Sequence, residues 1–109
     1  MAITYKTLGQ VNPSATTPTT LYTVPAATSA VVSTLVVCNQ AATAATFRVS
    51  VRVAALADTA KQYLYYDVAL PANSTFTGTL GVTLAATDVV TVYASSATLS
   101  VGLFGSEIA

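Results

Sequence analysis

The sequence predicts an all-β fold, an antiparallel β-sandwich or jelly roll of about eight short strands in a single domain. Short runs rich in valine, threonine, leucine and tyrosine alternate between apolar and polar side chains. Proline, asparagine, serine and glycine separate these runs, and no segment keeps helical spacing long enough for a stable helix. A chain of 109 residues can bury roughly 60 to 65 % of its unfolded surface in one core.

Residues 31–38 form the densest β-branched segment, which favours a pleated backbone over a helix. Apolar residues occupy both faces of this predicted strand, with Val31, Leu35 and Val37 on one face and Val32, Val36 and Cys38 on the other. We therefore expect a central strand that is covered on both sides, with Cys38 buried and reduced.

The next strand, residues 47–53, shows the strictest alternation in the chain. Its apolar side chains point one way and its polar side chains the other: Phe47, Val49, Val51 and Val53 against Arg48, Ser50 and Arg52. This pattern predicts one face in the core and one face in solvent or in an interface.

We interpret residues 1–20 as an N-terminal strand and arm, and residues 21–109 as the β-sandwich domain. Residues 3–8 form the first short strand, while the polar run 10–18, with two prolines and no periodicity, predicts a loop. We expect this arm to have few local partners and to reach a neighbouring subunit. Residues 20–24 form a second strand that ends at Pro25, which cannot donate to a sheet.

Residues 53–64 allow two interpretations. Their apolar residues match helical spacing, so one or two helical turns fit the pattern. We favour an irregular loop, because the flanking segments alternate as strands and so short an isolated helix is only marginally stable.

The remaining strands follow in order. Residues 62–70 alternate, with Leu64, Tyr66, Val68 and Leu70 predicted inside and Tyr63, Tyr65 and Asp67 outside. The turn formers of residues 71–73 predict a hairpin into residues 74–84. In strand 74–84 the side chains expected inside are Phe76, Leu80, Val82 and Leu84. Residues 89–93 form the next strand, and the last strand is expected to place Leu99, Val101 and Leu103 inside. Gly78 and Gly81 are expected to relieve crowding or mark a bulge.

Charged residues are few, and this observation predicts association. Four basic and four acidic residues cancel, and they make up 7 % of the chain against roughly a quarter in typical domains; the mean hydropathy is +0.64. This balance does not favour nucleic-acid binding, and no run has the length and character of a signal peptide or membrane helix. Because uncharged strand edges tend to associate, we expect a homo-oligomer, a trimer, with surfaces covered by other subunits.

We expect no enzymatic activity and no cofactor or metal. The chain has no histidine and no tryptophan, which removes Ser/His and Cys/His catalysis and histidine-based zinc sites. Its four acidic residues are isolated from one another in the sequence.

The candidate site residues lie on predicted outward faces: Tyr63, Tyr65, Tyr93, Arg48 and Arg52. Tyrosine and arginine give a protein interface large contact areas with polar ends, so we interpret this group as an interface. Exposed tyrosines are also suited to stacking on a sugar ring, so a carbohydrate-binding module is the alternative from another class.

Three segments resemble small β-rich virion proteins of tailed bacteriophages, notably phages of aquatic hosts: LYTVPAATSAVVSTLVVCN, KQYLYYDVAL and TDVVTVYASSATLSVGLFGSE. The resemblance runs from about Leu21 to Glu107. It implies a structural protein present in many copies in the virion, assembled in the host cytoplasm. We expect a capsid decoration or cement protein that binds the major capsid protein, with a tail, neck, baseplate or fibre component as the alternative. The resemblance transfers no binding residue.

Overall fold

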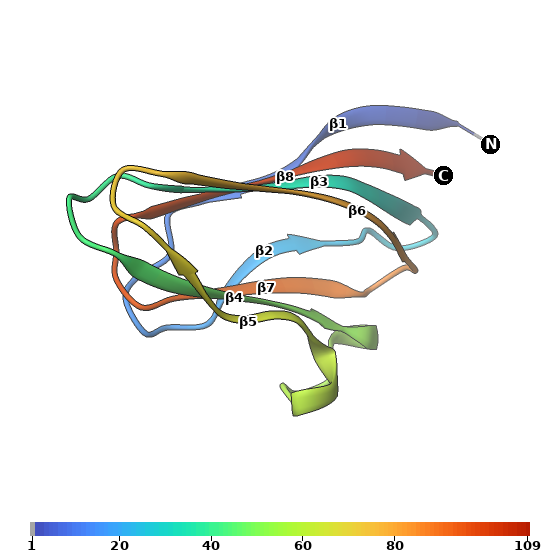
Figure 1. Ribbon diagram of the computed structural model, residues 1–109. Coiled ribbons are helices and arrows are strands. Elements are labelled where there is room, and N and C mark those ends of the chain that lie inside the picture. Colours follow the sequence, from blue (N-terminus) through green and yellow to red (C-terminus); the bar gives the residue numbers. More distant parts are fainter. Residues whose placement is uncertain (1) are drawn as a thin grey trace.

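The computed structural model describes residues 2–109. The chain forms two four-stranded antiparallel sheets that pack face to face (Figure 1). The all-β sandwich prediction is confirmed. The strands are β1 (Ile3–Val11), β2 (Thr19–Thr23), β3 (Ser29–Asn39), β4 (Ala45–Arg52), β5 (Tyr63–Leu70), β6 (Thr75–Leu84), β7 (Val89–Ala94) and β8 (Leu99–Ile108).

The strand order is that of a jelly roll. One sheet has the order β1-β8-β3-β6 and the other β2-β7-β4-β5, so the first strand pairs with the last, the second with the second to last, and so on inward. Consecutive strands therefore lie in opposite sheets, except β4 and β5, which pair with each other. The hairpin predicted at residues 71–73 is wrong: a turn does form there, but it carries the chain from one sheet to the other.

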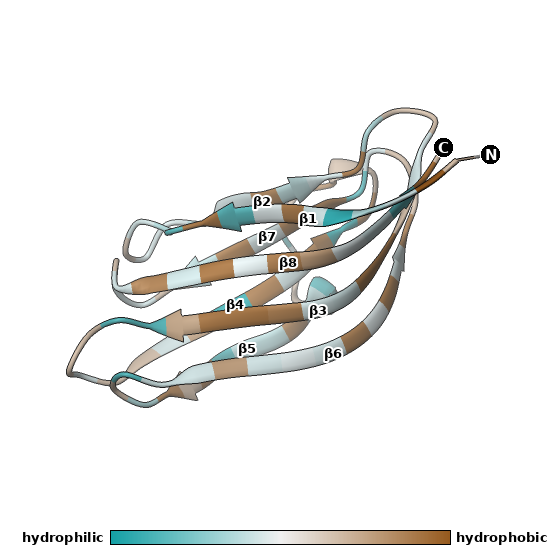
Figure 2. Cartoon of the chain, turned by 90° about the horizontal axis from the view of Figure 1, so that it is seen from above, coloured by the Kyte–Doolittle hydropathy of each residue, from teal (hydrophilic) through white to brown (hydrophobic). Residues whose placement is uncertain are grey.

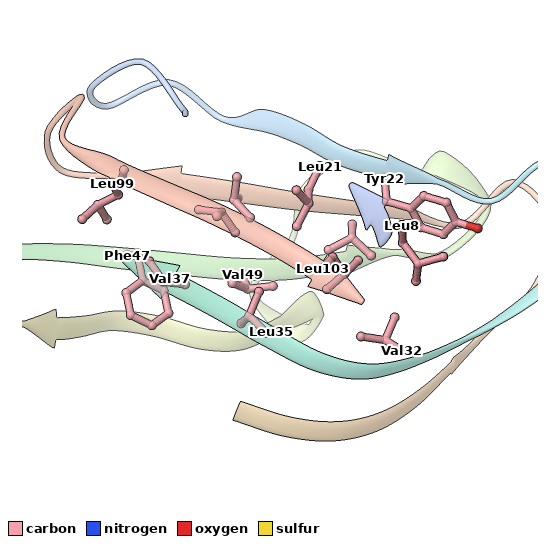
Figure 3. Close-up of a cluster of buried hydrophobic side chains, with 14 of the residues drawn as sticks. Leu8, Leu21, Tyr22, Val32, Leu35, Val37, Phe47, Val49, Leu99 and Leu103 are labelled. Carbon is pink, nitrogen blue, oxygen red and sulfur yellow. The ribbon is translucent and has the colours of Figure 1, made fainter. Parts of the chain in front are cut away.

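The core lies between the inner faces of the two sheets (Figure 3). Its central side chains are Leu8, Leu21, Tyr22, Val32, Leu35, Val37, Phe47, Val49, Leu99 and Leu103. The inward faces predicted for β6 and β8 are confirmed, as are Phe47 and Val49 in β4. Val51 is half-buried against the core, whereas Val53 is 60 % exposed because β4 ends at Arg52.

A β-bulge in β3 changes the predicted faces of this strand. Against β8, Val32 and Thr34 pair with the adjacent residues Gly105 and Phe104, which leaves Ser33 as an extra residue. The pairing with β6 shifts at the same place, but there the extra residue belongs to β6. Val32 therefore points into the core, while Val31 does not. The other face is only half-buried, and the prediction of a fully buried Cys38 is wrong, because no second layer covers this face within the described chain.

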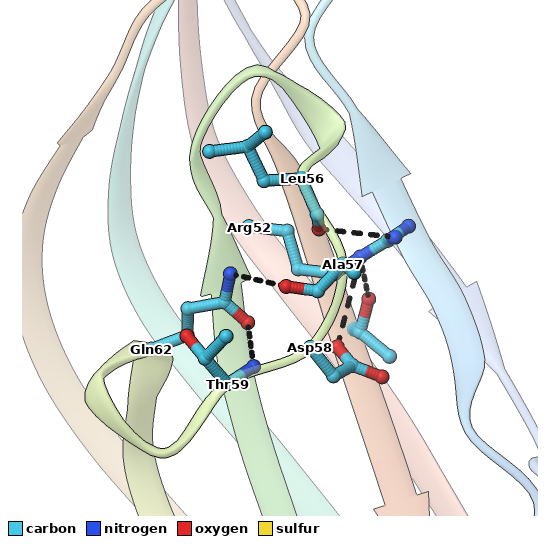
Figure 4. A network of polar contacts seen from close by, with 7 residues as sticks. Arg52, Leu56, Ala57, Asp58, Thr59 and Gln62 are labelled. Carbon is cyan, nitrogen blue, oxygen red and sulfur yellow. Dashed lines mark hydrogen bonds and ion pairs between the residues drawn. The ribbon is translucent and has the colours of Figure 1, made fainter.

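The connection between β4 and β5 is an irregular loop with two single turns of 3-10 helix, Val53–Ala55 and Ala60–Gln62. The Gln62 side chain holds the loop together: its Nε2 donates to the Ala57 carbonyl (3.0 Å), and its Oε1 accepts from the Thr59 amide (2.9 Å; Figure 4). Among residues 2–109, no helix is long and apolar enough to cross a membrane.

The N-terminal segment packs against the rest of this chain. β1 is the edge strand beside β8, and it extends to Val11 rather than ending near Leu8. Beyond it, Asn12 donates from Nδ2 to the carbonyl of Leu99 (2.6 Å), and the amide of Thr16 donates to the carbonyl of Ala94 (2.8 Å). The expectation that this arm has few local partners is therefore wrong.

Tyr22 links the two sheets. Its ring is buried in the core, and its hydroxyl donates to Glu107 Oε2 across the sandwich at 2.6 Å. Lys6 Nζ lies 3.5 Å from the other carboxylate oxygen. Burial raises the pKa of Tyr22 well above its ordinary value of 10.0, and the hydrogen bond and negative charge of Glu107 raise this pKa further.

We predict that Tyr22 makes the fold sensitive to alkali. The pKa of Tyr22 is raised in the folded state. Its contribution to the free energy of unfolding is therefore complete below pH 10.0. This contribution is lost as the pH rises further, because the unfolded chain releases the proton first. The urea midpoint of the wild type should fall between about pH 9 and about pH 11 more steeply than that of Tyr22→Phe. Tyr5→Phe, which changes a tyrosine that is 84 % exposed, should behave like the wild type. If the urea midpoints of wild type and Tyr22→Phe fell equally with pH, the prediction would be contradicted.

Candidate interaction surface

An arginine lies among tyrosines on the outer face of the β2-β7-β4-β5 sheet. Arg48 of β4 is directly opposite Tyr93 of β7. Its guanidinium carbon is 4.1 Å from the ring centroid of Tyr66 and 4.5 Å from that of Tyr93, within cation–π distance. With Tyr63 and Asp67, these residues form what we call the arginine–tyrosine cluster.

Asp67 holds the Arg48 side chain in place. Arg48 donates from Nε to Asp67 Oδ1 (2.6 Å) and from Nη2 to Asp67 Oδ2 (3.2 Å), a bidentate pair that fixes the plane of the guanidinium. The hydrogen bond lowers the pKa of Asp67 and raises that of Arg48. Both groups therefore stay ionised at neutral pH, and the cluster is already ordered in the isolated chain.

Tyr65 does not belong to this surface, although the alternation predicted it there. Its ring centroid is 5.2 Å from that of Phe76 and 6.2 Å from that of Phe47, so it packs against the core. Tyr66, predicted inside, is instead 58 % exposed. The cause is the register of β5 against β4, which shifts twice, with Asp67 at a positive φ of 50°. Each shift moves the following side chains to the opposite face.

Arg52 lies on the same strand as Arg48 but has a different role. It donates from Nε to Thr91 Oγ1 (3.2 Å) and from Nη1 to the Leu56 carbonyl (3.4 Å; Figure 4). The same Nε is 3.8 Å from Asp58 Oδ1. These contacts hold the β4–β5 loop against the sheet, so Arg52 stabilises the edge of the surface rather than presenting a free charge.

An open groove adjoins the arginine–tyrosine cluster. Its volume is about 490 Å³, and it is lined by Asp58, Thr59, Ala60, Tyr63 and Tyr66. The rings of Tyr63 and Tyr66 meet edge to face, with centroids 5.0 Å apart. Two aromatic rings beside a carboxylate and a hydroxyl suit either a protein partner or a sugar.

Arg48, Tyr63 and Tyr93 were predicted on this surface from the sequence. Asp67 was predicted to face outward but was not assigned to the site, and Tyr66 was predicted inside. No sequence signal reveals the direction of Tyr66, because it depends on bulges in the pairing with β4. In residues 2–109, histidine, cysteine, aspartate and glutamate form no group of three or more that could hold a metal ion. Comparisons of the chain with protein-family models, with curated proteins and with solved structures found no match.

Proposed function

We propose that this chain is a non-enzymatic structural protein of a bacteriophage virion, a decoration or cement protein that binds the capsid and stabilises the head. The observation that carries the proposal is the arginine–tyrosine cluster, a preordered surface on one face of a jelly roll with very few charges. Arginine and tyrosine are enriched among the residues that dominate protein interfaces. The resemblance of three segments to phage virion proteins adds support.

The proposed partners are other copies of this chain and other virion proteins such as the major capsid protein. A tail, neck, baseplate or fibre position fits the same surface and the same resemblance. Mass spectrometry of purified virions tests the structural role, and labelling of intact particles with a specific antibody tests the position. The absence of the chain from virions would overturn the proposal, and a label on the tail would move it from the head.

We predict that Arg48→Ala weakens binding to particles depleted of this protein by on the order of tenfold or more, as loss of a central interface residue does. The substitution removes the cation that orders Tyr66, Tyr93 and Asp67. Occupancy of the particles is measured at a series of protein concentrations. Tyr5→Ala, which truncates an exposed tyrosine of the opposite sheet, is the matched control. Equal occupancy of wild type and Arg48→Ala would exclude the cluster from the interface.

Carbohydrate binding is the second candidate, and the groove beside the cluster favours it. Tyr63 and Tyr66 offer aromatic surface there, and Asp58 offers a carboxylate for sugar hydroxyls. A glycan array with wild type, Tyr63→Ala and Tyr66→Ala separates the two functions. Specific binding that both substitutions abolish would favour a carbohydrate-binding module.

A further inference from the structure

Four strands form free edges of the two sheets, and three of them carry features that discourage pairing with another chain. β2 is short and lies between Pro18 and Pro25. β5 has two register shifts and the charged Asp67, and β1 has Lys6 and a register shift after Thr7. Short length, proline, charge and bulges are the usual means by which natural sheets protect their edges.

β6 is the exception. It is ten residues long, with the sequence TFTGTLGVTL, and contains no charged residue and no proline. It pairs with β3 on one side only and forms the free edge of its sheet, next to β5 (Figure 2). Its outward row of threonines is exposed. The bulge at Leu80 and Gly81, where φ of Gly81 is 68°, interrupts the strand near its end and leaves residues 75–79 as a regular segment.

Apolar side chains are exposed beside this edge. Leu64 of β5 is 44 % exposed and lies with Leu80 and Val82 of β6 around a small void between the sheets. Val53 and Leu56 continue this surface from Leu64 along the β4–β5 loop, and both are more than half exposed. A partner strand at β6 would thus gain backbone hydrogen bonds and lie next to apolar surface that is open to water.

We infer that β6 pairs antiparallel with β6 of a second copy of this chain about a two-fold axis, which joins two four-stranded sheets into one continuous sheet. A two-fold axis perpendicular to the sheet keeps the threonine rows of both copies on one face and the apolar rows, such as Phe76 and Leu80, on the other. Threonine pairs across strands are favourable, and no like charges oppose one another.

The alternation of β6 restricts the register of this contact. Residues directly opposite each other in an antiparallel pair share a face, so the axis lies midway between a residue and its own copy in the partner. The centre of the regular segment is Thr77. A substitution at Thr77 therefore faces its own copy.

This contact deepens the self-association part of the proposed function and changes its expected form. A two-fold contact closes on itself and produces dimers. The trimer expected from the sequence would instead need a contact between two different edges, such as β6 with β1 of the next copy. Substitutions on β6 and β1 therefore distinguish the two arrangements.

The experiment measures the mass of the purified full chain by sedimentation equilibrium over a range of concentrations. We expect a dimer for the wild type. Thr77→Lys and Thr77→Glu should each weaken it by on the order of tenfold or more, because like charges then face each other. An equimolar mixture of the two variants should restore dimers. Thr4→Lys, at an exposed threonine of β1, is the matched control and should leave the dimer intact.

Several outcomes would overturn the inference: a monomeric or trimeric wild type, equal weakening by Thr4→Lys, or a mixture that stays monomeric. Thermal unfolding of each variant shows whether it is folded. If Thr77→Lys unfolds, a double variant with Thr75→Lys and Thr79→Lys replaces it, because these exposed positions oppose each other across the axis at Thr77. The measurement uses no particles. If the wild type proves monomeric, the virion proposal is unaffected. If the chain is absent from virions, the inference of a dimer is unaffected.

Discussion

Phe47→Ala is expected to lower the free energy of unfolding by about 3–5 kcal/mol, the largest effect of any single truncation that we predict. Phe47 is 2 % exposed and points from β4 into the core. Its ring centroid lies 5.3 Å from that of Phe76 and 6.2 Å from that of Tyr65. The substitution leaves a cavity beside the two remaining rings, Tyr65 and Phe76, which come from different sheets.

Urea denaturation followed by circular dichroism measures this change. Val49→Ala, on the same face of β4, should cost less, about 1–3 kcal/mol, because it removes a smaller side chain. Tyr66→Ala removes an exposed ring and should cost about 1 kcal/mol or less, the value of an exposed cation–π contact. If Phe47→Ala proved as mild as Tyr66→Ala, the sheets would pack differently from the arrangement described above.

Asn39→Ala is expected to cost about 2–4 kcal/mol, because it leaves several buried polar groups without a partner. Asn39 ends β3 and is 1 % exposed. Its Nδ2 lies 2.9 Å from the Thr43 carbonyl and 3.3 Å from the carbonyls of Leu70 and Pro71. Its Oδ1 accepts from the Ala41 amide (3.1 Å) and from the Thr98 hydroxyl (3.2 Å).

The contacts of Asn39 connect three turns at one end of the sandwich, so the loss should extend beyond its own strand. Hydrogen exchange should speed up in the β3–β4, β5–β6 and β7–β8 connections together. Gln40→Ala changes an exposed neighbour and should shift the unfolding free energy by about 0.5 kcal/mol or less. Exchange that changes only next to residue 39 would show that the three turns are independent.

The alternation of apolar and polar residues was sufficient to predict the strands and much of the core. Phe47, Val49, Leu99 and Leu103 face inward as the pattern requires. The pattern fails where a bulge adds a residue, as at Ser33 and before Asp67, because the period of two then resumes with the opposite phase. Bulges depend on how two strands pair, which a single strand's sequence does not specify.

Local sequence also could not assign strands to sheets. Pro71 and Asn73 predict a turn, and Asn73 does adopt a positive φ of 52°. A turn of this kind is compatible with a hairpin or with a crossing between the two sheets. The chain crosses here because β6 pairs with the distant strand β3. The same holds for the interaction surface. Arg48 and Tyr93 could be assigned to outward faces, but their contact follows from the register of β4 with β7.

The pairing of β1 with β8 determines when this chain can finish folding. The partner of β1 is the last strand of the fold to be synthesised, and Ala2 and Ala109 exchange backbone hydrogen bonds of 2.9 Å. Translation proceeds at about 5–20 residues per second, so β1 has to wait for seconds on the ribosome without its neighbour. The first sheet therefore closes only after β8 has left the ribosome, and contacts between residues so distant in sequence make this closure slow.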